Sequence, residues 1–172
     1  MRKTKIKKAR GKPKLVPGVH VIEGNTSISR ARIAIVASRY NDYIVERLIR
    51  SCLMTLQTGG VIAKSISLLR VPGAFELPVT VARLAQNGNY DAIIALGAVI
   101  RGETPHFDYI CTECAGGLAR IATASGIPVI FGVLTVDNTG QAEDRSGDNE
   151  SNKGREAAQS AIEMISLLRK LG

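Results

Sequence analysis

The sequence predicts a three-layer α/β fold, in which a four-stranded parallel sheet lies between helices on both of its faces. Two observations lead to this prediction. Short apolar runs rich in β-branched residues occur four times, as expected for strands buried on both faces. A segment with the 3.6-residue apolar period of a helix follows each run, and this alternation produces parallel sheets with right-handed crossovers. With 172 residues, the chain is expected to form one domain.

The four expected strands are short and apolar. The first, Arg32-Ile-Ala-Ile-Val-Ala37, is almost uninterrupted by polar residues, and the third runs directly into a polar loop that ends at His106. We expect the flavodoxin-like strand order 2-1-3-4 for a sheet of this size. The expected strands span residues 32–37, 65–71, 91–100 and 129–136.

Helices are expected between and after these strands. Gly59 and Gly60 end the first helix. Arg169 and Lys170 lie in the last turn of the fourth, where the helix dipole favours cations. No regular element is assigned to the polar, acidic residues 137–151. The apolar residues that mark the four helices lie within residues 44–56, 77–85, 107–125 and 158–168.

The formal net charge of +8 belongs to the N-terminus. Residues 1–14 contain eight lysine and arginine residues and no acid, which leaves 15 basic and 15 acidic residues in the rest of the chain. We expect residues 1–14 to be a disordered, solvated arm. Electrostatic binding of nucleic acid is the alternative, but no aromatic residue is interleaved for base stacking. Residues 15–30 are expected to be a leader with an edge strand at His20–Ile22, and residues 31–172 a single domain.

Membrane insertion and secretion are not expected. No apolar run approaches the length of a membrane span, and no apolar core follows the basic N-terminus as it does in a secretory signal. A soluble cytoplasmic protein is the simplest interpretation, with a mitochondrial-type presequence as the alternative.

Short motifs for metals and nucleotides are weak in this chain. Cys111-Thr-Glu-Cys114 matches C-x-x-C, which occurs in redox sites and as half of a zinc site. Both cysteines also lie on the apolar stripe of the third helix, which favours buried thiols and no metal site. Neither G-x-x-x-x-G-K-[ST] nor G-x-G-x-x-G occurs, so nucleotide hydrolysis is disfavoured.

Polar and aromatic residues follow the first three expected strands, in residues 38–41, 71–76 and 97–106. In open α/β sheets, ligands bind outside the carboxyl ends of the strands. These segments carry aromatic rings, carboxylates, guanidinium groups, hydroxyls and an imidazole, a set that suits a planar heterocycle with polyol groups beside a small anion. We therefore expect the three segments to be neighbours and to form the ligand site.

Most of these residues also have a structural explanation. The alternative for Tyr40 is a cap on the core, and for Phe75 an anchor for its helix. Glu76 lies in the first turn of a helix, where the dipole alone favours acids. Thr104 as N-cap and Pro105 at the first helical position describe an ordinary helix start. The same start is also an anion site, because free backbone N–H groups point outward there.

His106 is the strongest catalytic candidate. It stands near the start of the third helix, where the dipole favours the neutral ring that a general base requires. Arg145 and Lys153 follow the fourth strand, and the pattern alone predicts that both are exposed to solvent.

Five segments together resemble the lumazine synthase family and occur in its order and spacing. The third and longest of them is the most specific. The resemblance covers about residues 30–170 and leaves out the first 15 or so. The matching segments are Arg39–Asp42, Val71–Pro78, Gly97–Tyr109, Pro128–Thr135 and Asn152–Gly154.

The resemblance implies a transferase of riboflavin biosynthesis that works without a cofactor. It implies the condensation of 5-amino-6-(D-ribitylamino)uracil with 3,4-dihydroxy-2-butanone 4-phosphate to 6,7-dimethyl-8-ribityllumazine, with release of phosphate and water. The alternative is a non-catalytic flavin- or lumazine-binding shell protein that has kept the pocket.

The resemblance also implies a role for individual residues. His106 would transfer protons. The residues implied to bind the organic part of the substrates are Tyr40, Asn41, Ala74, Phe75, Glu76, Ala98, Val99, Ile100 and Phe131. Those implied to bind phosphate are Gly102, Glu103, Thr104, Arg145 and Lys153. Phe131 and Arg145 would come from a neighbouring subunit, with Lys153 near them.

For the assembly, the resemblance implies a pentamer with active sites between subunits and an association with riboflavin synthase. Assembly of twelve pentamers into a 60-subunit shell stays open. Asp148, Asn149 and Glu150 stand where glycine, lysine and small residues are common in shell-forming members. Tyr40 replaces the more usual phenylalanine or tryptophan, a change that preserves a ring for stacking.

Overall fold

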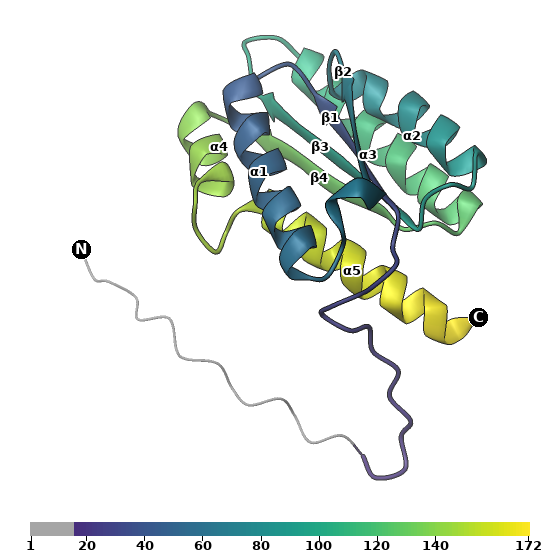
Figure 1. Ribbon diagram of the computed structural model, residues 1–172. Coiled ribbons are helices and arrows are strands. Elements are labelled where there is room, and N and C mark those ends of the chain that lie inside the picture. Colours follow the sequence, from purple (N-terminus) through teal and green to yellow (C-terminus); the bar gives the residue numbers. More distant parts are fainter. Residues whose placement is uncertain (1–15) are drawn as a thin grey trace.

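Four parallel strands form the central sheet, in the order β2-β1-β3-β4 (Figure 1). The structure is a computed structural model that describes residues 16–172, so the expected basic arm at residues 1–14 lies outside the described residues. The fold class and the strand order agree with the prediction. The strands are β1 (Ile33–Ser38), β2 (Ile66–Val71), β3 (Ala92–Ile100) and β4 (Val129–Val136).

Helices cover both faces of this sheet, with α1, α4 and α5 on one side and α2 and α3 on the other (Figure 1). Alternate residues of β1 divide between the two layers: Ile33 and Ile35 face α1 and α5, whereas Val36 faces α2 and α3. None of the helices in the described part of the chain is long and apolar enough to cross a membrane. The helices are α1 (Asp42–Thr58), α2 (Leu77–Gln86), α3 (His106–Ser125), α4 (Thr139–Ser146) and α5 (Lys153–Leu171), with 3₁₀ turns η1 (Ala63–Ser65) and η2 (Ala74–Glu76).

The short helix α4 lies in the segment to which no regular element is assigned from the sequence. The side chain of Asn138 caps it and accepts a hydrogen bond from the N–H of Gln141 (3.0 Å). Of its eight residues, only Ala142 and Ser146 are buried. The helix therefore lacks the apolar stripe on which its prediction would depend.

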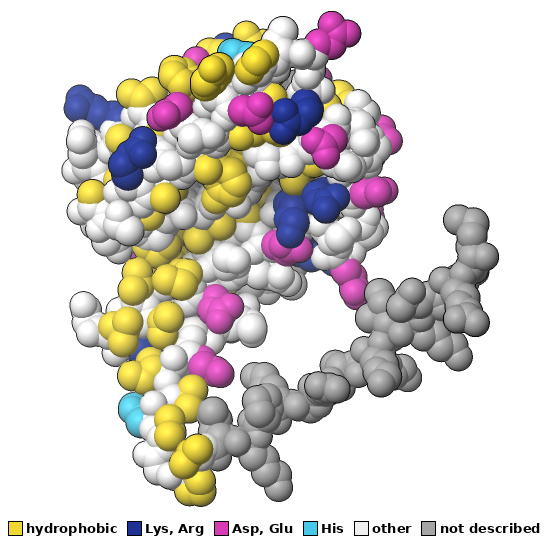
Figure 2. All heavy atoms as spheres, turned by 180° about the vertical axis from the view of Figure 1, so that it is seen from behind, with side chains coloured by type: hydrophobic (Ala, Val, Ile, Leu, Met, Phe, Trp, Pro, Cys, Tyr) yellow, Lys and Arg dark blue, Asp and Glu magenta, His cyan; other side chains and the backbone are white. Residues whose placement is uncertain are grey.

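The edge strand expected at His20–Ile22 is absent from the sheet of this chain. The leader runs along α5 instead, because side chains of α5 hold it. Lys170 Nζ donates to the Glu23 carbonyl (2.6 Å), and the Ser166 hydroxyl accepts from the backbone N–H of Asn25 (3.0 Å). The start of the leader extends away from the domain, and Figure 2 shows hydrophobic side chains gathered along it. Its exposed large hydrophobic residues are Val16, Val19, Val21 and Ile22.

Helices α1 and α5 approach each other closely at Gly154. A Cβ atom at this position would lie 2.0 Å from the Leu48 carbonyl oxygen of α1. Just before it, the Asn152 side chain caps α5, and its oxygen accepts from the N–H groups of Gly154 (2.9 Å) and Arg155 (3.2 Å). The Asn152 amide also donates to the Ser146 carbonyl (2.7 Å). One short segment therefore fixes the ends of α4 and α5 against α1.

Replacement of Gly154 by alanine is expected to lower the free energy of unfolding by about 3 kcal/mol, because the added methyl group meets backbone atoms. Alanine favours a helix by up to about 1 kcal/mol over glycine, which offsets part of the cost. Urea unfolding followed by circular dichroism measures the change. Gly102→Ala is the matched control, since a Cβ atom there has nothing within 4 Å. Equal stability of the two variants would contradict the close packing.

Candidate active site

The loops that follow β1, β2 and β3 lie side by side at the carboxyl edge of the sheet. The Tyr40 N–H donates to the Pro72 carbonyl (3.1 Å), which joins the first loop to the second. The Asn41 side-chain amide donates to the Ala98 carbonyl (2.9 Å), which joins the first loop to the third. Asn41 does so from a left-handed backbone conformation (φ 58°), which asparagine tolerates better than most residues. The three segments are therefore neighbours, as the sequence predicts.

Strand β3 is longer than β1, and its last residues have no strand partner on the β1 side. Pairing with β1 ends at Leu96, whereas pairing with β4 continues to Ile100. The backbone N–H and C=O groups of these last residues that are not paired in the sheet need another hydrogen-bond partner. The Asn41 side chain provides one for Ala98. The remaining groups of this open edge can bind a ligand that carries donors and acceptors in one plane.

The direction of the peptide groups decides which residues of β3 serve this edge. Asn41 meets the Ala98 carbonyl on the open side, whereas the Arg101 N–H donates to the β4 residue Val136 (2.9 Å). Peptide groups of successive residues in a parallel strand point to opposite sides. The backbone groups of Ala98 and Ile100 therefore face the open side. Those of Val99 face β4, so the geometry supports a backbone role for Val99 less well.

Two aromatic rings face solvent at this edge. Tyr40 is 70% exposed and Phe75 is 57% exposed, so Tyr40 is not a cap on the core and Phe75 is not a buried anchor. The Tyr40 ring lies against Gly73, where a Cβ atom would be 2.8 Å from the ring carbon Cδ2. Glu76 Oε2 accepts from the Gly73 N–H (2.8 Å) and so closes the turn that carries Phe75. These contacts fix the Tyr40 ring from one side and leave its other side open.

The loop from β3 to α3 is anchored at its first residue, Arg101. The guanidinium group donates to Asp108 (3.0 and 3.3 Å) and Asp137 (3.2 Å). It also lies 4.1 Å from the centroid of the Phe107 ring, a cation–π contact. The hydrogen bonds to Asp108 and then Asp137 raise the pKa of Arg101 above its ordinary value. Because these partners belong to the same chain, Arg101 positions the loop and does not need a ligand.

The start of α3 has no side-chain cap. The prediction that Thr104 is the N-cap is wrong, because Pro105 occupies that position with backbone angles that are already helical (φ −63°, ψ −5°). The helix begins at His106, and both Thr104 and His106 are exposed. Backbone N–H groups of an uncapped first turn attract anions. The exposed segment Gly102–Thr104 lies directly before this turn.

The remaining candidates, Phe131, Arg145 and Lys153, line a separate hollow of about 320 Å³ between β4 and α5. Phe131 pairs with Ala95, five residues before the end of β3 at Ile100, so it lies roughly 16 Å from that end along the strand. Arg145 is exposed, as the pattern predicts, whereas Lys153 is partly buried. A single chain therefore carries the candidate residues in two separate sets.

The sequence model of a family described as 6,7-dimethyl-8-ribityllumazine synthase matches residues 30–169 of this chain. The chain belongs to this family. It is accordingly an enzyme of a transferase family, with the lumazine synthase activity of riboflavin biosynthesis. The match includes both sets of candidate residues and most of the described domain.

The sequence alone did not identify the residues that hold the β3–α3 loop in place without contacting a ligand. Arg101 is the clearest, because its partners Asp108 and Asp137 are separated along the chain and meet only in the fold. Ser38 belongs to the first of the segments predicted to form the site, but it is 1% exposed at the end of β1, and its hydroxyl has no hydrogen-bond partner among the described residues. The weak signal available for Arg101 is a cation at a strand end followed by an acid in the first turn of a helix.

The three cysteines are free thiols, and of the two in the C-x-x-C pattern Cys114 is buried, as predicted, whereas Cys111 is only partly buried. Burial raises the pKa of Cys52 to about 12 and the pKa of Cys114 to about 11. Cys111 is half-buried, and burial raises its pKa as well. Raised thiol pKa values oppose redox and metal-binding chemistry. Within residues 16–172, no group of three or more histidine, cysteine or acidic residues is arranged to hold a metal ion.

Replacement of Arg101 by alanine is expected to loosen residues 102–106 and speed their amide hydrogen exchange, while global stability changes little because the ion pairs are exposed. Arg101→Lys is expected to restore only part of the protection, since an ammonium group cannot reproduce the planar contacts to two carboxylates and a ring. Arg120→Ala removes another exposed ion pair, with Glu113, and is the control. Unchanged exchange at residues 102–106 in Arg101→Ala would contradict the positioning role.

Proposed function

We propose that this protein condenses 5-amino-6-(D-ribitylamino)uracil with 3,4-dihydroxy-2-butanone 4-phosphate to 6,7-dimethyl-8-ribityllumazine, with release of phosphate and water. One observation carries the proposal. The open edge of β3 is joined by Asn41 to the loop that carries the exposed Tyr40 ring, and it leads into the uncapped start of α3. The substrates contain a planar uracil, a polyol chain and a phosphate, and this edge offers a partner for each.

The uracil would stack on the open side of the Tyr40 ring, with its edge toward β3. The backbone groups of Ala98 and Ile100 that face the open side would hydrogen-bond its ring atoms. Asn41 holds the Ala98 carbonyl and so keeps this edge in place (2.9 Å). Val99 would contribute through packing, because its peptide groups face β4.

The ribityl chain would lie along the turn η2, which follows β2 at the same edge. Ala74 and Phe75 would form its apolar side. Glu76 Oε2 accepts a hydrogen bond from the Gly73 N–H (2.8 Å). The other carboxylate oxygen would be available to a ribityl hydroxyl. A turn held by its own carboxylate keeps the site in one conformation before the substrate binds.

The phosphate would bind at the start of α3, between Gly102 and Thr104. Gly102 gives the phosphate close access to the backbone, and Thr104 supplies an exposed hydroxyl. Glu103 would act through its backbone N–H, because its carboxylate repels a phosphate. Arg145 and Lys153 of a neighbouring subunit would supply the positive charge, and a guanidinium matches two phosphate oxygens at once.

His106 would transfer protons during formation of the imine and loss of the phosphate. It is the first residue of α3 and follows the proposed phosphate site by two residues. These steps require proton transfer more than a covalent nucleophile, so one histidine is sufficient. Holding two reactants together can contribute up to roughly 7–11 kcal/mol, so much of the acceleration would come from the site as a whole.

The complete site would form between subunits of a pentamer. The separation of Phe131, Arg145 and Lys153 from the other candidates supports this arrangement, because one chain does not bring the two sets together. The exposed hydrophobic side chains of the leader also support association, since no other part of residues 16–172 covers them. Assembly of pentamers into a shell and association with riboflavin synthase are further proposals, which light scattering and co-purification test.

The direct test is to mix the two substrates with the protein and follow the absorbance and fluorescence of the lumazine. His106→Gln is expected to lower turnover by roughly 10²-fold, and His20→Gln, in the leader, is the control with no expected change. Well-folded protein that binds lumazine but forms no product would contradict the catalytic proposal and support the non-catalytic binding alternative. Normal turnover in His106→Gln would contradict only the role of this histidine.

A second test examines the shared site. His106→Ala and Arg145→Gln are each expected to be nearly inactive as pure proteins. When the two are unfolded together and refolded as a mixture, about a quarter of the sites in a ring would combine an intact histidine with an intact arginine from the neighbour. Lumazine formation should therefore recover to about that level. A mixture with no more activity than its components would contradict a site shared between subunits.

A further inference from the structure

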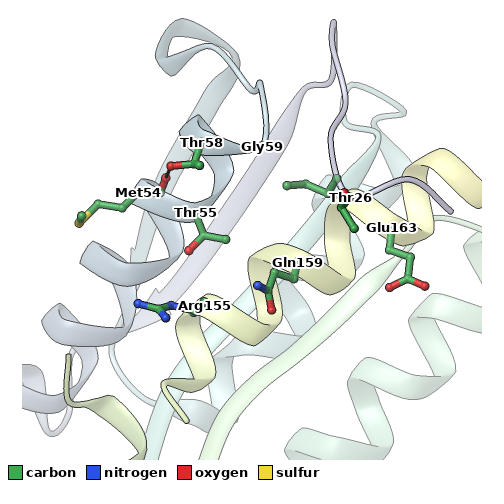
Figure 3. A pocket seen from close by; sticks show the side chains of 9 residues that line it. Thr26, Met54, Thr55, Thr58, Gly59, Arg155, Gln159 and Glu163 are labelled. Atoms are coloured by element: carbon green, nitrogen blue, oxygen red, sulfur yellow. Dashed lines mark hydrogen bonds between the residues drawn. The ribbon is translucent and has the colours of Figure 1, made fainter. Parts of the chain in front are cut away.

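A groove runs between α1 and α5, on the face of the sheet opposite α2 and α3. Its two connected hollows, of about 650 and 520 Å³, share Met54, Thr55 and Arg155. Figure 3 shows the larger hollow, with Arg155 of α5 pointing toward α1 and with Met54 and Thr55 on the α1 side. None of the residues that line this groove belongs to the candidate active site.

The smaller hollow carries a concentration of positive charge. Arg47 and Arg50 lie one turn apart on α1, and Arg155 lies opposite on α5. Asp148 is the one carboxylate among the residues described as lining this hollow. Within residues 16–172, none of the three guanidinium groups forms an ion pair. Like charges at this spacing on a helix destabilise it, and a bound anion removes the repulsion.

One residue that lines the same hollow, Ser146, has a buried hydroxyl without a hydrogen-bond partner among the described residues. Ser146 is only 1% exposed. A buried hydroxyl without a hydrogen-bond partner lowers stability, and an oxygen atom of a bound ligand could accept a hydrogen bond from it. The neighbouring Asn152 side chain is already engaged by both its oxygen and its nitrogen.

The two sides of the hollow are held at a fixed distance. Gly154 contacts the α1 backbone at Leu48, and the Asn152 side chain joins the end of α4 to the start of α5. Leu48 follows Arg47 directly on α1, and Gly154 precedes Arg155 directly on α5. Charged groups that are already positioned bind a ligand with less loss of conformational entropy.

We propose that this hollow binds the phosphate group of a small anion, separately from the active site. Three guanidinium groups and one carboxylate give its lining a net charge of +2, which matches a phosphate dianion. Guanidinium groups bind phosphate oxygens in pairs, and the Ser146 hydroxyl adds a neutral donor. The adjoining hollow, lined by Met54, Thr58 and Gln159, has room for the organic part of a phosphomonoester.

The proposal is tested by calorimetric titration with inorganic phosphate at constant ionic strength, on the intact protein and three variants. Arg145→Gln removes a phosphate contact of the proposed active site and should keep binding in the α1–α5 groove. Arg50→Gln/Arg155→Gln should weaken groove binding at least tenfold and leave lumazine formation unchanged. Arg83→Gln/Arg120→Gln removes the same charge elsewhere and should bind as the intact protein does. A parallel titration with glycerol 3-phosphate distinguishes an organic phosphate, which would bind more tightly, from free phosphate.

Three results would overturn the proposal. The first is phosphate binding that is unaffected by Arg50→Gln/Arg155→Gln, and the second is an equal loss in the charge-matched control. The third is a change of assembly size in Arg50→Gln/Arg155→Gln by light scattering, without phosphate binding in the intact protein. That result would assign these arginines to a contact with another copy. Phosphate binding in the groove without lumazine formation would contradict the proposed function alone.

Ser146→Ala gives an independent check on the site. This variant should weaken phosphate binding severalfold, while its stability without phosphate stays the same or rises, because an unsatisfied buried hydroxyl is removed. A loss of stability in the absence of phosphate would mean that the hydroxyl has a structural partner. That outcome, like unchanged phosphate affinity, would contradict its place in the site.

Discussion

Beyond Leu96, strand β3 continues without β1 beside it, and the candidate active site is built on this overhang. Strand β1 stops because the chain turns at Asn41, which adopts the left-handed conformation and returns its side chain to Ala98. Backbone groups in a sheet must be paired, so the rest of the overhang requires water or a ligand. The loops after β1 and β2, which carry the exposed rings of Tyr40 and Phe75, lie beside this overhang, and the uncapped start of α3 follows it.

The parts of the fold that the sequence predicts are those with strong local signals. Strand β1 is buried along its whole length, and its sequence is apolar up to its last residue, Ser38. The order of the strands follows from general rules for β–α alternation, and these rules also bring the three loops to one edge. Tyr40 and Phe75 could be selected from the sequence, but their exposure, which separates a ligand-binding ring from a core ring, required the structure.

The parts that the sequence does not reveal depend on contacts between distant segments or on weak patterns. Helix α4 buries too few side chains to produce a periodic signal. The leader follows α5 because Lys170 and Ser166 hold it there, and no local pattern at His20–Ile22 contains this information. Arg101 acquires its role only where Asp108 and Asp137 converge. The resemblance implies that Phe131 and Arg145 come from a neighbouring subunit, but the separation of the two sets within one chain depends on the register between β3 and β4, which the sequence leaves undefined.

The contact between Tyr40 and Gly73 makes these two positions unequal under substitution. Gly73 has extended backbone angles (φ −141°, ψ −175°) that suit any residue, so its conformation does not require glycine. The space available does require it, because an added carbon would meet the Tyr40 ring at 2.8 Å and displace it. Any aromatic ring of similar size can lie on a bare backbone. Substitution by another aromatic residue at position 40 is therefore compatible with this contact, whereas a side chain at position 73 is not, and the absent side chain of Gly73 sets the position of the Tyr40 ring.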